Sequence, residues 1–133
     1  MSSLKIDRNI DVEEEIRVAL SDYMKCYVRP LPANFEVPSI LITAVGGSTE
    51  NTVDYFDVTL DSRATEDATA LENLRNAVGI VIAIAKSQTT KLRFADVNNI
   101  ASWGKDPVRP ELAMCTARLR VLAHIETVEV NTI

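Results

Sequence analysis

Two β-rich runs, separated by a loop that begins with two glycines, dominate the pattern of apolar and polar positions. In the run 53–60, Phe56, Val58 and Leu60 alternate with more polar residues, which is the period of a strand with one buried and one exposed face. The run 38–45 is apolar at nearly every position, as in a central strand. The pattern therefore predicts a β-hairpin, around which the rest of the chain is organised.

An amphipathic helix is predicted before this hairpin. Asp11 suits the N-cap, and Glu14, three residues later, completes the sequence pattern of a capping box. From Val12 onward, apolar residues recur at spacings of three and four and give one apolar face. We expect this helix to end by Arg29, because the prolines of the connector 30–37 favour extended backbone.

A longer helix is predicted after the hairpin, from a cap at Thr65 to about Ser87. Its apolar positions form a packing stripe with helical spacing. The residues of this stripe are Ala68, Leu71, Leu74, Val78, Ile82 and Ala85. We expect this helix to lie across one face of the sheet, against Phe56, Val58 and Leu60.

Beyond this helix, a weak strand and a long loop are predicted. The segment 91–97 alternates, with Leu92 and Phe94 on the same face. Residues 98–111 contain paired asparagines, a glycine and two prolines, a composition typical of a loop. This loop surrounds Trp103, the only tryptophan of the chain.

The last predicted element is a long strand over 113–130, whose apolar positions alternate with Arg118, Arg120 and His124. Its exposed face is therefore basic. The order of elements is helix, strand, strand, helix, strand, strand. This order predicts an α/β fold of the α+β type, with an antiparallel sheet of about four strands flanked by helices.

Length and composition point to an ordinary globular protein. The 133 residues fit a single domain, which we expect to span residues 1–133 with a frayed start over residues 1–10. The longest apolar run, residues 78–85, is far below the roughly 20 residues that cross a bilayer. The start of the chain lacks the apolar core of a signal peptide, so we expect a protein that is made and kept in the cytoplasm.

Charge and cysteine content argue against two classes of binding site. The formal net charge is −5, and a negative surface repels phosphate, so we expect no sequence-specific nucleic-acid binding and no main role in gripping a nucleic-acid backbone. Cys26 and Cys115 are the only cysteines, and neither belongs to a CxxC pair. We expect reduced, packed thiols rather than a disulfide framework or a thiolate metal site.

No group of residues in the sequence predicts a particular chemistry. His124, the only histidine, has no activating motif that would pair it with either cysteine. The glycines of the hairpin loop are not followed by the second glycine and the lysine of a phosphate-binding loop. The acidic residues that follow the hairpin loop have ordinary places on a strand face or in a first helical turn. We expect a protein without catalytic, cofactor or metal sites.

Several residues are better interpreted as contact residues for a partner. Tryptophan and arginine are enriched at interface hot spots, and a glycine-led hairpin loop can present itself to a neighbour. A solvated strand face and a loop-anchoring tryptophan explain the same residues equally well. The candidates for subunit or partner contact are Gly46, Gly47, Asn51, Trp103, Arg109, Arg118 and Arg120.

The chain resembles the phage tail-terminator and tail-completion family, whose members include head-tail joining and minor tail proteins. The likeness covers residues 11–130 and rests on element order with sparse motifs. These motifs are Arg29-Pro30-Leu31-Pro32, a strand ending in Gly46-Gly47, a strand with Asp54, Asp57 and Asp61, a helix opening at residues 64–68, and a closing arginine-rich strand. The segment 91–97 departs from the family pattern because it is less regular.

The resemblance implies a phage or prophage structural protein without enzymatic activity and without a cofactor. Proteins of this family form a ring, commonly of six subunits, that caps the tail tube and meets the head connector. The implied partners are further copies of the chain, the tail-tube protein and the head-connector protein, and a membrane is not among them. The implied locations are the host bacterial cytoplasm during assembly and then the virion tail. The hairpin and the loop around Trp103 would contact neighbouring subunits.

Two alternatives stay open. One is a small cytoplasmic module with a ferredoxin-like or related α+β fold, which oligomerises and binds a small ligand. The other is a hydrolase that uses clustered carboxylates for metal-assisted hydrolysis. Its candidate residues are Asp54, Asp57, Asp61, Glu66 and Asp67.

Overall fold

The central hairpin is formed by β3 (Ser39–Glu50) and β4 (Val53–Ala64) in the computed structural model, which describes residues 2–50 and 53–133. The two strands are antiparallel, and Ile42 lies opposite Leu60. The predicted hairpin is confirmed, but its strands are longer than expected. The first strand continues through the two glycines, with a register shift between Gly46 and Thr49.

The hairpin belongs to a mixed sheet of five strands in the order β2-β3-β4-β6-β5. β6 (Ala113–His124) pairs antiparallel with both β4 and β5 (Leu92–Lys105), whereas β2 (Cys26–Val28) runs parallel to β3. The prediction of an antiparallel sheet of about four strands was therefore wrong in strand number and in direction. The coarser prediction of a mixed α/β fold is confirmed.

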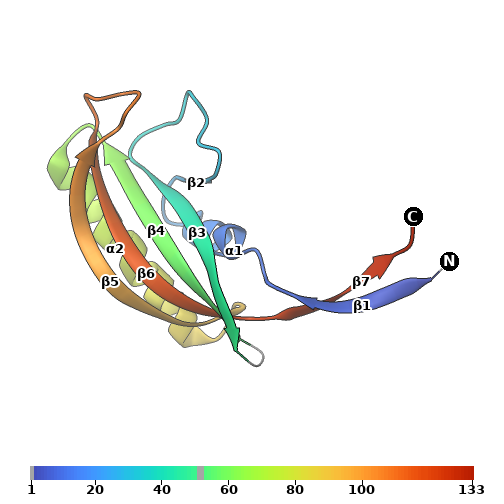
Figure 1. Cartoon of the computed structure of the whole chain (residues 1–133). Coiled ribbons are helices and arrows are strands. Elements are labelled where there is room, and N and C mark those ends of the chain that lie inside the picture. Colours follow the sequence, from blue (N-terminus) through green and yellow to red (C-terminus); the bar gives the residue numbers. More distant parts are fainter. Residues whose placement is uncertain (1, 51–52) are drawn as a thin grey trace.

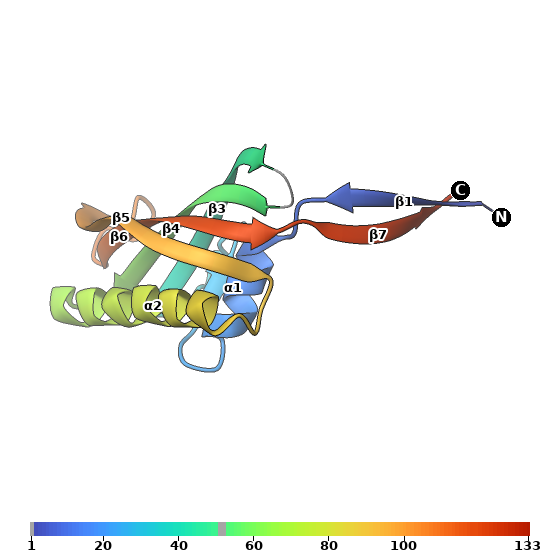
Figure 2. The same ribbon diagram turned by 90° about the horizontal axis from the view of Figure 1, so that it is seen from below.

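Both helices lie on the same face of this sheet, as Figures 1 and 2 show. The helix α1 (Val12–Leu20) has Asp11 as its N-cap, and the Asp11 carboxylate accepts a hydrogen bond from the backbone N–H of Glu14 at 3.2 Å. This cap confirms the predicted start. The helix ends at Leu20, earlier than expected, and residues 26–28 form β2, which covers part of the outer edge of β3.

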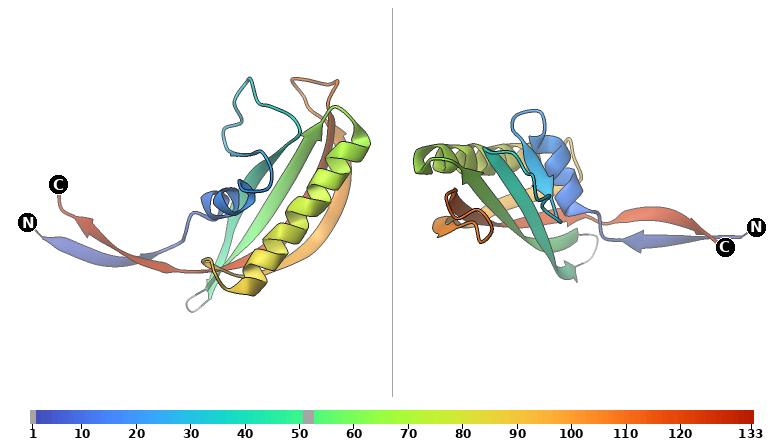
Figure 3. Two further views of the ribbon diagram at one scale, coloured as in Figure 1. Left: turned by 180° about the vertical axis from the view of Figure 1, so that it is seen from behind. Right: turned by 90° about the horizontal axis from the view of Figure 1, so that it is seen from above.

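The helix α2 (Asp67–Ser87) crosses the sheet, as seen from behind in Figure 3. It begins after Glu66 rather than after Thr65, and no side chain caps it. The buried side chains are Ala70, Leu74, Ala77, Val78, Val81 and Ala85. Ala68 of the predicted stripe is exposed, and Leu71 and Ile82 are only half-buried, so the buried side is rotated from the expected one. α2 is also long and apolar enough to pass for a membrane span by length and composition alone, but here its buried side packs on the sheet.

β5 replaces both the weak strand and most of the long loop that the sequence predicted. Trp103 lies in this strand, opposite Cys115 of β6, and only residues 106–112 connect the two strands. A register shift between Leu92 and Phe94 turns the first side chain into the core and the second to the exposed face. The expectation that these two residues share a face was therefore wrong, because a bulge breaks the alternation of a strand.

A second, two-stranded sheet stands clear of the body (Figures 1 and 2). It is formed by β1 (Ser3–Arg8) and β7 (Glu126–Asn131), which pair antiparallel, and we call it the arm. Sequence patterning left residues 1–10 without a regular element. The predicted strand over 113–130 is in fact two strands, because the chain leaves the five-stranded sheet at Ile125 and continues into the arm.

Candidate functional site

The sheet surface opposite the helices, called here the helix-free face, carries the exposed arginines of β6. Ala117, Leu119 and Val121 point toward α2 and are fully buried, so the alternating Arg118 and Arg120 must point to the other side. The guanidinium of Arg120 lies 4.7 Å from the ring centroid of Tyr55 on β4. The prediction that β6 has a basic exposed face is confirmed.

Three arginines of this face lack a carboxylate partner within the described part of the chain. The sequence has nine arginines, and six of them form ion pairs with Asp or Glu. The others are Arg93, Arg118 and Arg120. Nη1 of Arg93 lies 3.4 Å from Nε2 of the His124 ring. Asp57 and Asp96 lie opposite Arg120 on the same face, so its charge is mixed. The three guanidinium groups are strong donors and favour binding of an acceptor-rich partner.

An apolar row crosses the helix-free face beside these arginines. Tyr55, Leu122 and Phe94 lie opposite one another on β4, β6 and β5. Val45 of β3 lies opposite Asp57, two residues along β4 from Tyr55. Phe94 is 54% exposed and Val45 is 61% exposed. We call these four residues the apolar row. Large apolar side chains gathered at a solvent-facing surface are typical of an interaction site.

The opposite end of the sheet holds a buried ion pair that joins two loops. Arg63 of β4 donates from Nε to the Asp106 carboxylate at 2.7 Å, and both side chains are buried. Asp106 also accepts hydrogen bonds from the backbone N–H groups of Val108 and Arg109. Burial on its own would raise the pKa of Asp106, but these hydrogen bonds and Arg63 outweigh it, so the pKa lies below its ordinary value.

Phe35 connects this ion pair to the loop before β3. The Arg109 guanidinium lies 4.9 Å from the Phe35 ring centroid, and its Nη1 donates to the Phe35 carbonyl at 3.1 Å. A mostly apolar pocket of about 400 Å³ opens beside these residues, between Leu31 and Val108. Nη1 of Arg63 is buried here without a hydrogen-bond partner among the described residues. The place is therefore suited to an apolar molecule that carries an acceptor group.

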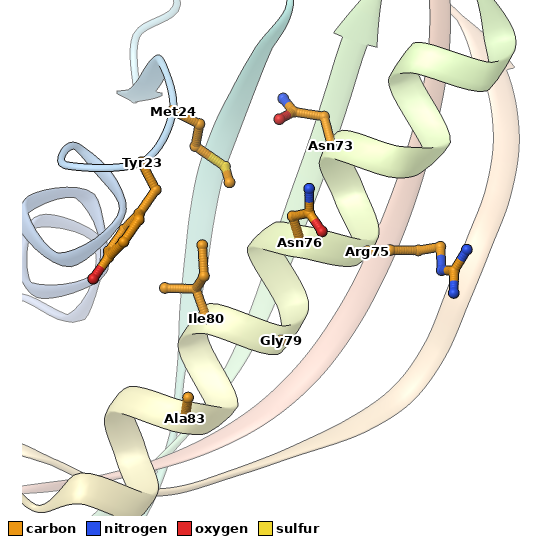
Figure 4. A pocket seen from close by; sticks show the side chains of 8 residues that line it. All are labelled: Tyr23, Met24, Asn73, Arg75, Asn76, Gly79, Ile80 and Ala83. Atoms are coloured by element: carbon orange, nitrogen blue, oxygen red, sulfur yellow. The ribbon is translucent and has the colours of Figure 1, made fainter.

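A shallow groove lies on the helical side, between α2 and the turn that follows α1 (Figure 4). Tyr23 and Met24 form one wall, and Ile80 and Ala83 belong to the other, around a volume of about 470 Å³. Arg75 points away from the groove in Figure 4. The groove offers apolar contact area and amide groups, and no charged side chain points into it among those that Figure 4 labels.

The residues predicted to make contacts do not form one site. Gly46 is exposed near one end of the sheet, and Gly47 lies at the register shift of β3, while Asn51 is outside the described residues. Trp103, 51% exposed, and Arg109 lie toward the other end. Arg118 and Arg120 lie between these groups, and they are the only two of the set whose side chains the described structure places side by side on one face.

The thiols and the histidine are not arranged as a nucleophile and base. Cys115 points into the core and His124 to the helix-free face of the same strand. Burial, together with the charges of Asp67 and Asp61, raises the pKa of the Cys115 thiol to about 11. The Cys26 thiol donates a weak hydrogen bond to the Arg17 carbonyl at 3.4 Å. Within the described residues, no three His, Cys, Asp or Glu side chains are grouped so that they could hold a metal ion.

Two features were missed by the interpretation of the sequence. The arm was missed, although Leu4 and Ile6 at one end of the chain and Val128 and Val130 at the other both alternate with polar residues, as exposed ribbons do. The Arg63–Asp106 ion pair joins residues 43 positions apart, and no local sequence pattern predicts it.

A comparison of the chain with models of known protein families finds no match, and a comparison with curated proteins finds none either.

Proposed function

We propose that the chain is a structural protein of a phage or prophage tail, a terminator that forms a ring at the head-proximal end of the tail tube and joins it to the head connector. The arm carries this proposal. The arm pairs β1 with β7 and stands clear of the body, and a two-stranded ribbon is marginally stable on its own. Contact with a neighbouring subunit would stabilise such a ribbon, as expected for a protein that assembles into a ring.

The helix-free face supports the same proposal. It combines three arginines without a carboxylate partner with an apolar row, within the described part of the chain. Apolar contacts beside arginine side chains are the usual composition of a protein–protein interface. In this proposal the chain acts as a non-enzymatic assembly protein, first in the bacterial cytoplasm and then in the virion.

The test is the particle that the chain forms. Light scattering over a wide range of concentration, with negative-stain images of the same sample, should give closed rings with a central hole, alone or on added tail tubes. Ring size follows from the mass, because one chain is 14.7 kDa. A compact dimer at every concentration, with tubes left uncapped, would contradict the proposal.

A second candidate is a small ligand-binding module. The pocket beside Phe35 favours it, because the buried Nη1 of Arg63 lacks a partner among the described residues. A buried donor without an acceptor costs about 1–3 kcal/mol, and a ligand carboxylate would remove this cost. Thermal stabilisation by members of a panel of apolar carboxylic acids, lost in a Val108→Glu variant that narrows the pocket, would favour this module over the terminator.

A further inference from the structure

The arm has two chemically different faces. Along β1, Leu4 and Ile6 lie on one face, and their cross-strand partners Val130 and Val128 lie on the same face. The other face carries Ser3, Lys5, Asp7, Thr127, Glu129 and Asn131. An antiparallel ribbon with this alternation is the pattern of strands with one covered face and one solvated face. The outer part of the apolar face is uncovered in the single chain, where Leu4 is 66% exposed and Val130 is 47% exposed, while Ile6 and Val128 are half-buried.

The arm is well tied together at both ends. At its base, the Glu126 carboxylate forms ion pairs with Arg8 at 2.9 Å and with Lys91 at 3.1 Å. The hydrogen bonds that both cations donate lower the pKa of Glu126. Near its tip, the backbone N–H of Thr132 donates to the Ser2 carbonyl at 3.0 Å. Because the ribbon is held as a unit and extends beyond the body (Figure 2), its own chain cannot cover its apolar face.

We propose that the apolar face of the arm covers the apolar row on the helix-free face of a second copy of this chain. The inference rests on the proposed function, and it names the two surfaces that join neighbouring subunits. A closed ring needs a contact between two different surfaces of the same chain, and these two surfaces match in kind. One is a ribbon with four aliphatic side chains, and the other is a row of four large apolar side chains.

Charge favours the same pairing over the groove between α1 and α2. β7 carries only acidic charges, and Glu129 has no ion pair among the described residues. Arg120 and Arg118 precede Leu122 of the apolar row along β6, and neither forms an ion pair within the described residues, although Asp57 and Asp96 lie opposite Arg120. The long side chains of both arginines extend toward the edge of a ribbon laid over the row, where the free backbone carbonyls of β7 lie, whereas Glu129 belongs to the outer face of the arm. The groove offers only Arg75, which is paired with Glu72 and points away.

The size of the arm limits what it contributes. Six residues per strand span about 20 Å, and the two strands with their side chains are about 10 Å wide, so one such contact buries about 400 Å² in total. A stable interface buries about 1,200–2,000 Å². The arm therefore supplies part of the contact between two copies, and the rest comes from the bodies of the two subunits.

Variants of the full chain in which the introduced cysteine accompanies only the buried Cys115 test the contact. Phe94→Cys and Val128→Cys are prepared separately in a Cys26→Ser background, mixed and oxidised with diamide. We expect a disulfide between residues 94 and 128, identified by mass spectrometry of the dimer band on a non-reducing gel. In separate preparations this bond can form only between two copies. Ala83→Cys, in the groove between α1 and α2, is mixed with Val128→Cys as the matched control and should give little product.

Three results would overturn the inference. A 128–128 disulfide as the main product would show that arms join each other, and a dominant 83–128 disulfide would place the arm in the groove between α1 and α2. A yield of the 94–128 disulfide no higher than that of the control pair would show that the arm does not meet the apolar row. Rings in negative stain without the 94–128 bond would overturn this contact and leave the proposed function standing. The 94–128 bond in a sample that never exceeds a dimer, with or without tail tubes, would support the contact and count against the ring.

Assembly gives a second, independent measurement. Val128→Glu places a charge on the apolar face of the arm and should weaken self-association about tenfold or more. Asn131→Glu adds the same charge to the polar face and should change it by about twofold or less. Both variants should melt as the unmodified chain does, because the arm lies outside the core. Equal self-association of the two variants would contradict the inference.

Discussion

Glu13 and Arg29 together close the outer edge of β3 at Ala44. The Glu13 carboxylate accepts the Ala44 N–H at 3.0 Å, and Arg29 Nη2 donates to the Ala44 carbonyl at 3.3 Å. The two side chains also pair with each other, Nε to Oε2 at 3.1 Å. β2 covers this edge only as far as Ile42. The side-chain pair therefore takes the place of a further strand where an open edge would invite pairing with another chain.

We predict that Glu13→Gln destabilises the protein by about 1 kcal/mol, because a charged acceptor of the Ala44 N–H is replaced by a neutral one. Burial alone would raise the pKa of Glu13, but the hydrogen bonds from Arg29 and Ala44 hold it below its ordinary value of 4.5. The stabilisation is therefore complete above about pH 4.5 and is lost as the pH falls through the lower pKa of the folded state.

Urea unfolding at several pH values checks this prediction. The Glu13 carboxylate should become protonated over a window of about two pH units, roughly from pH 5 to pH 3. In this window the free energy of unfolding should fall more steeply in the unmodified chain than in Glu13→Gln. Glu14→Gln is the matched control, because Glu14 pairs with Arg17 within α1 and no β-strand backbone depends on it. Parallel pH profiles for Glu13→Gln and the unmodified chain would contradict the assignment.

The bulge in β5 predicts opposite outcomes for two neighbouring apolar residues. Leu92 is 1% exposed and Phe94 is 54% exposed. Leu92→Ala should lower the free energy of unfolding by about 2–5 kcal/mol, because it leaves a cavity in the core. Phe94→Ala should change it by about 0.5 kcal/mol or less. Chemical denaturation of both variants decides the register, and similar losses would restore the regular alternation that the sequence suggests.

The elements that the sequence predicts best are those with long, uninterrupted periodicity. The alternation of Phe56, Val58 and Leu60 and the helical spacing over residues 67–87 both appear in the structure. Their periods are set by the burial of a whole face, and local exceptions do not hide them. The cap at Asp11 is also local, since it joins residues three positions apart.

The elements that the sequence does not reveal depend on distant partners. β2 has three residues, and its strand geometry comes from pairing with β3. The arm joins the two end segments of the chain, so neither strand has a turn beside it. The register shifts of β5 likewise cannot be seen in an alternating pattern. Trp103 was therefore expected in a loop, although it lies in this strand. Of the candidate contact residues, only Arg118 and Arg120 follow from a simple alternation.

The Arg63–Asp106 pair should be among the most sensitive positions of the fold. Asp106→Ala leaves the buried Arg63 charge without its carboxylate and frees two backbone N–H groups. We expect a loss of about 3–5 kcal/mol in the free energy of unfolding. The double variant Arg63→Met, Asp106→Leu should recover part of this loss, because no uncompensated charge is then buried. A double variant less stable than Asp106→Ala would indicate that the loop needs the ion pair itself.

Cys115 should be inert in the folded protein. It is fully buried, and burial raises the pKa of its thiol to about 11, so at pH 8 only about one thiol in a thousand is ionised. Titration with a thiol reagent at pH 8 should therefore modify Cys26 alone, and slowly, because burial raises the pKa of Cys26 as well. Cys115 should react only in denaturant, with Cys26→Ser as the variant that isolates its signal.

The same shift makes the fold sensitive to alkaline pH. The Cys115 thiol ionises near its ordinary pKa of 9.0 in the unfolded chain and near 11 in the folded one. Its contribution to stability is therefore complete below about pH 9 and is lost as the pH rises toward 11. Urea unfolding of the unmodified chain should show this decline, and Cys115→Ala should lack it. Rapid modification of both thiols in the native protein, or identical alkaline profiles for the two chains, would show that the core around β6 opens more readily than its packing implies.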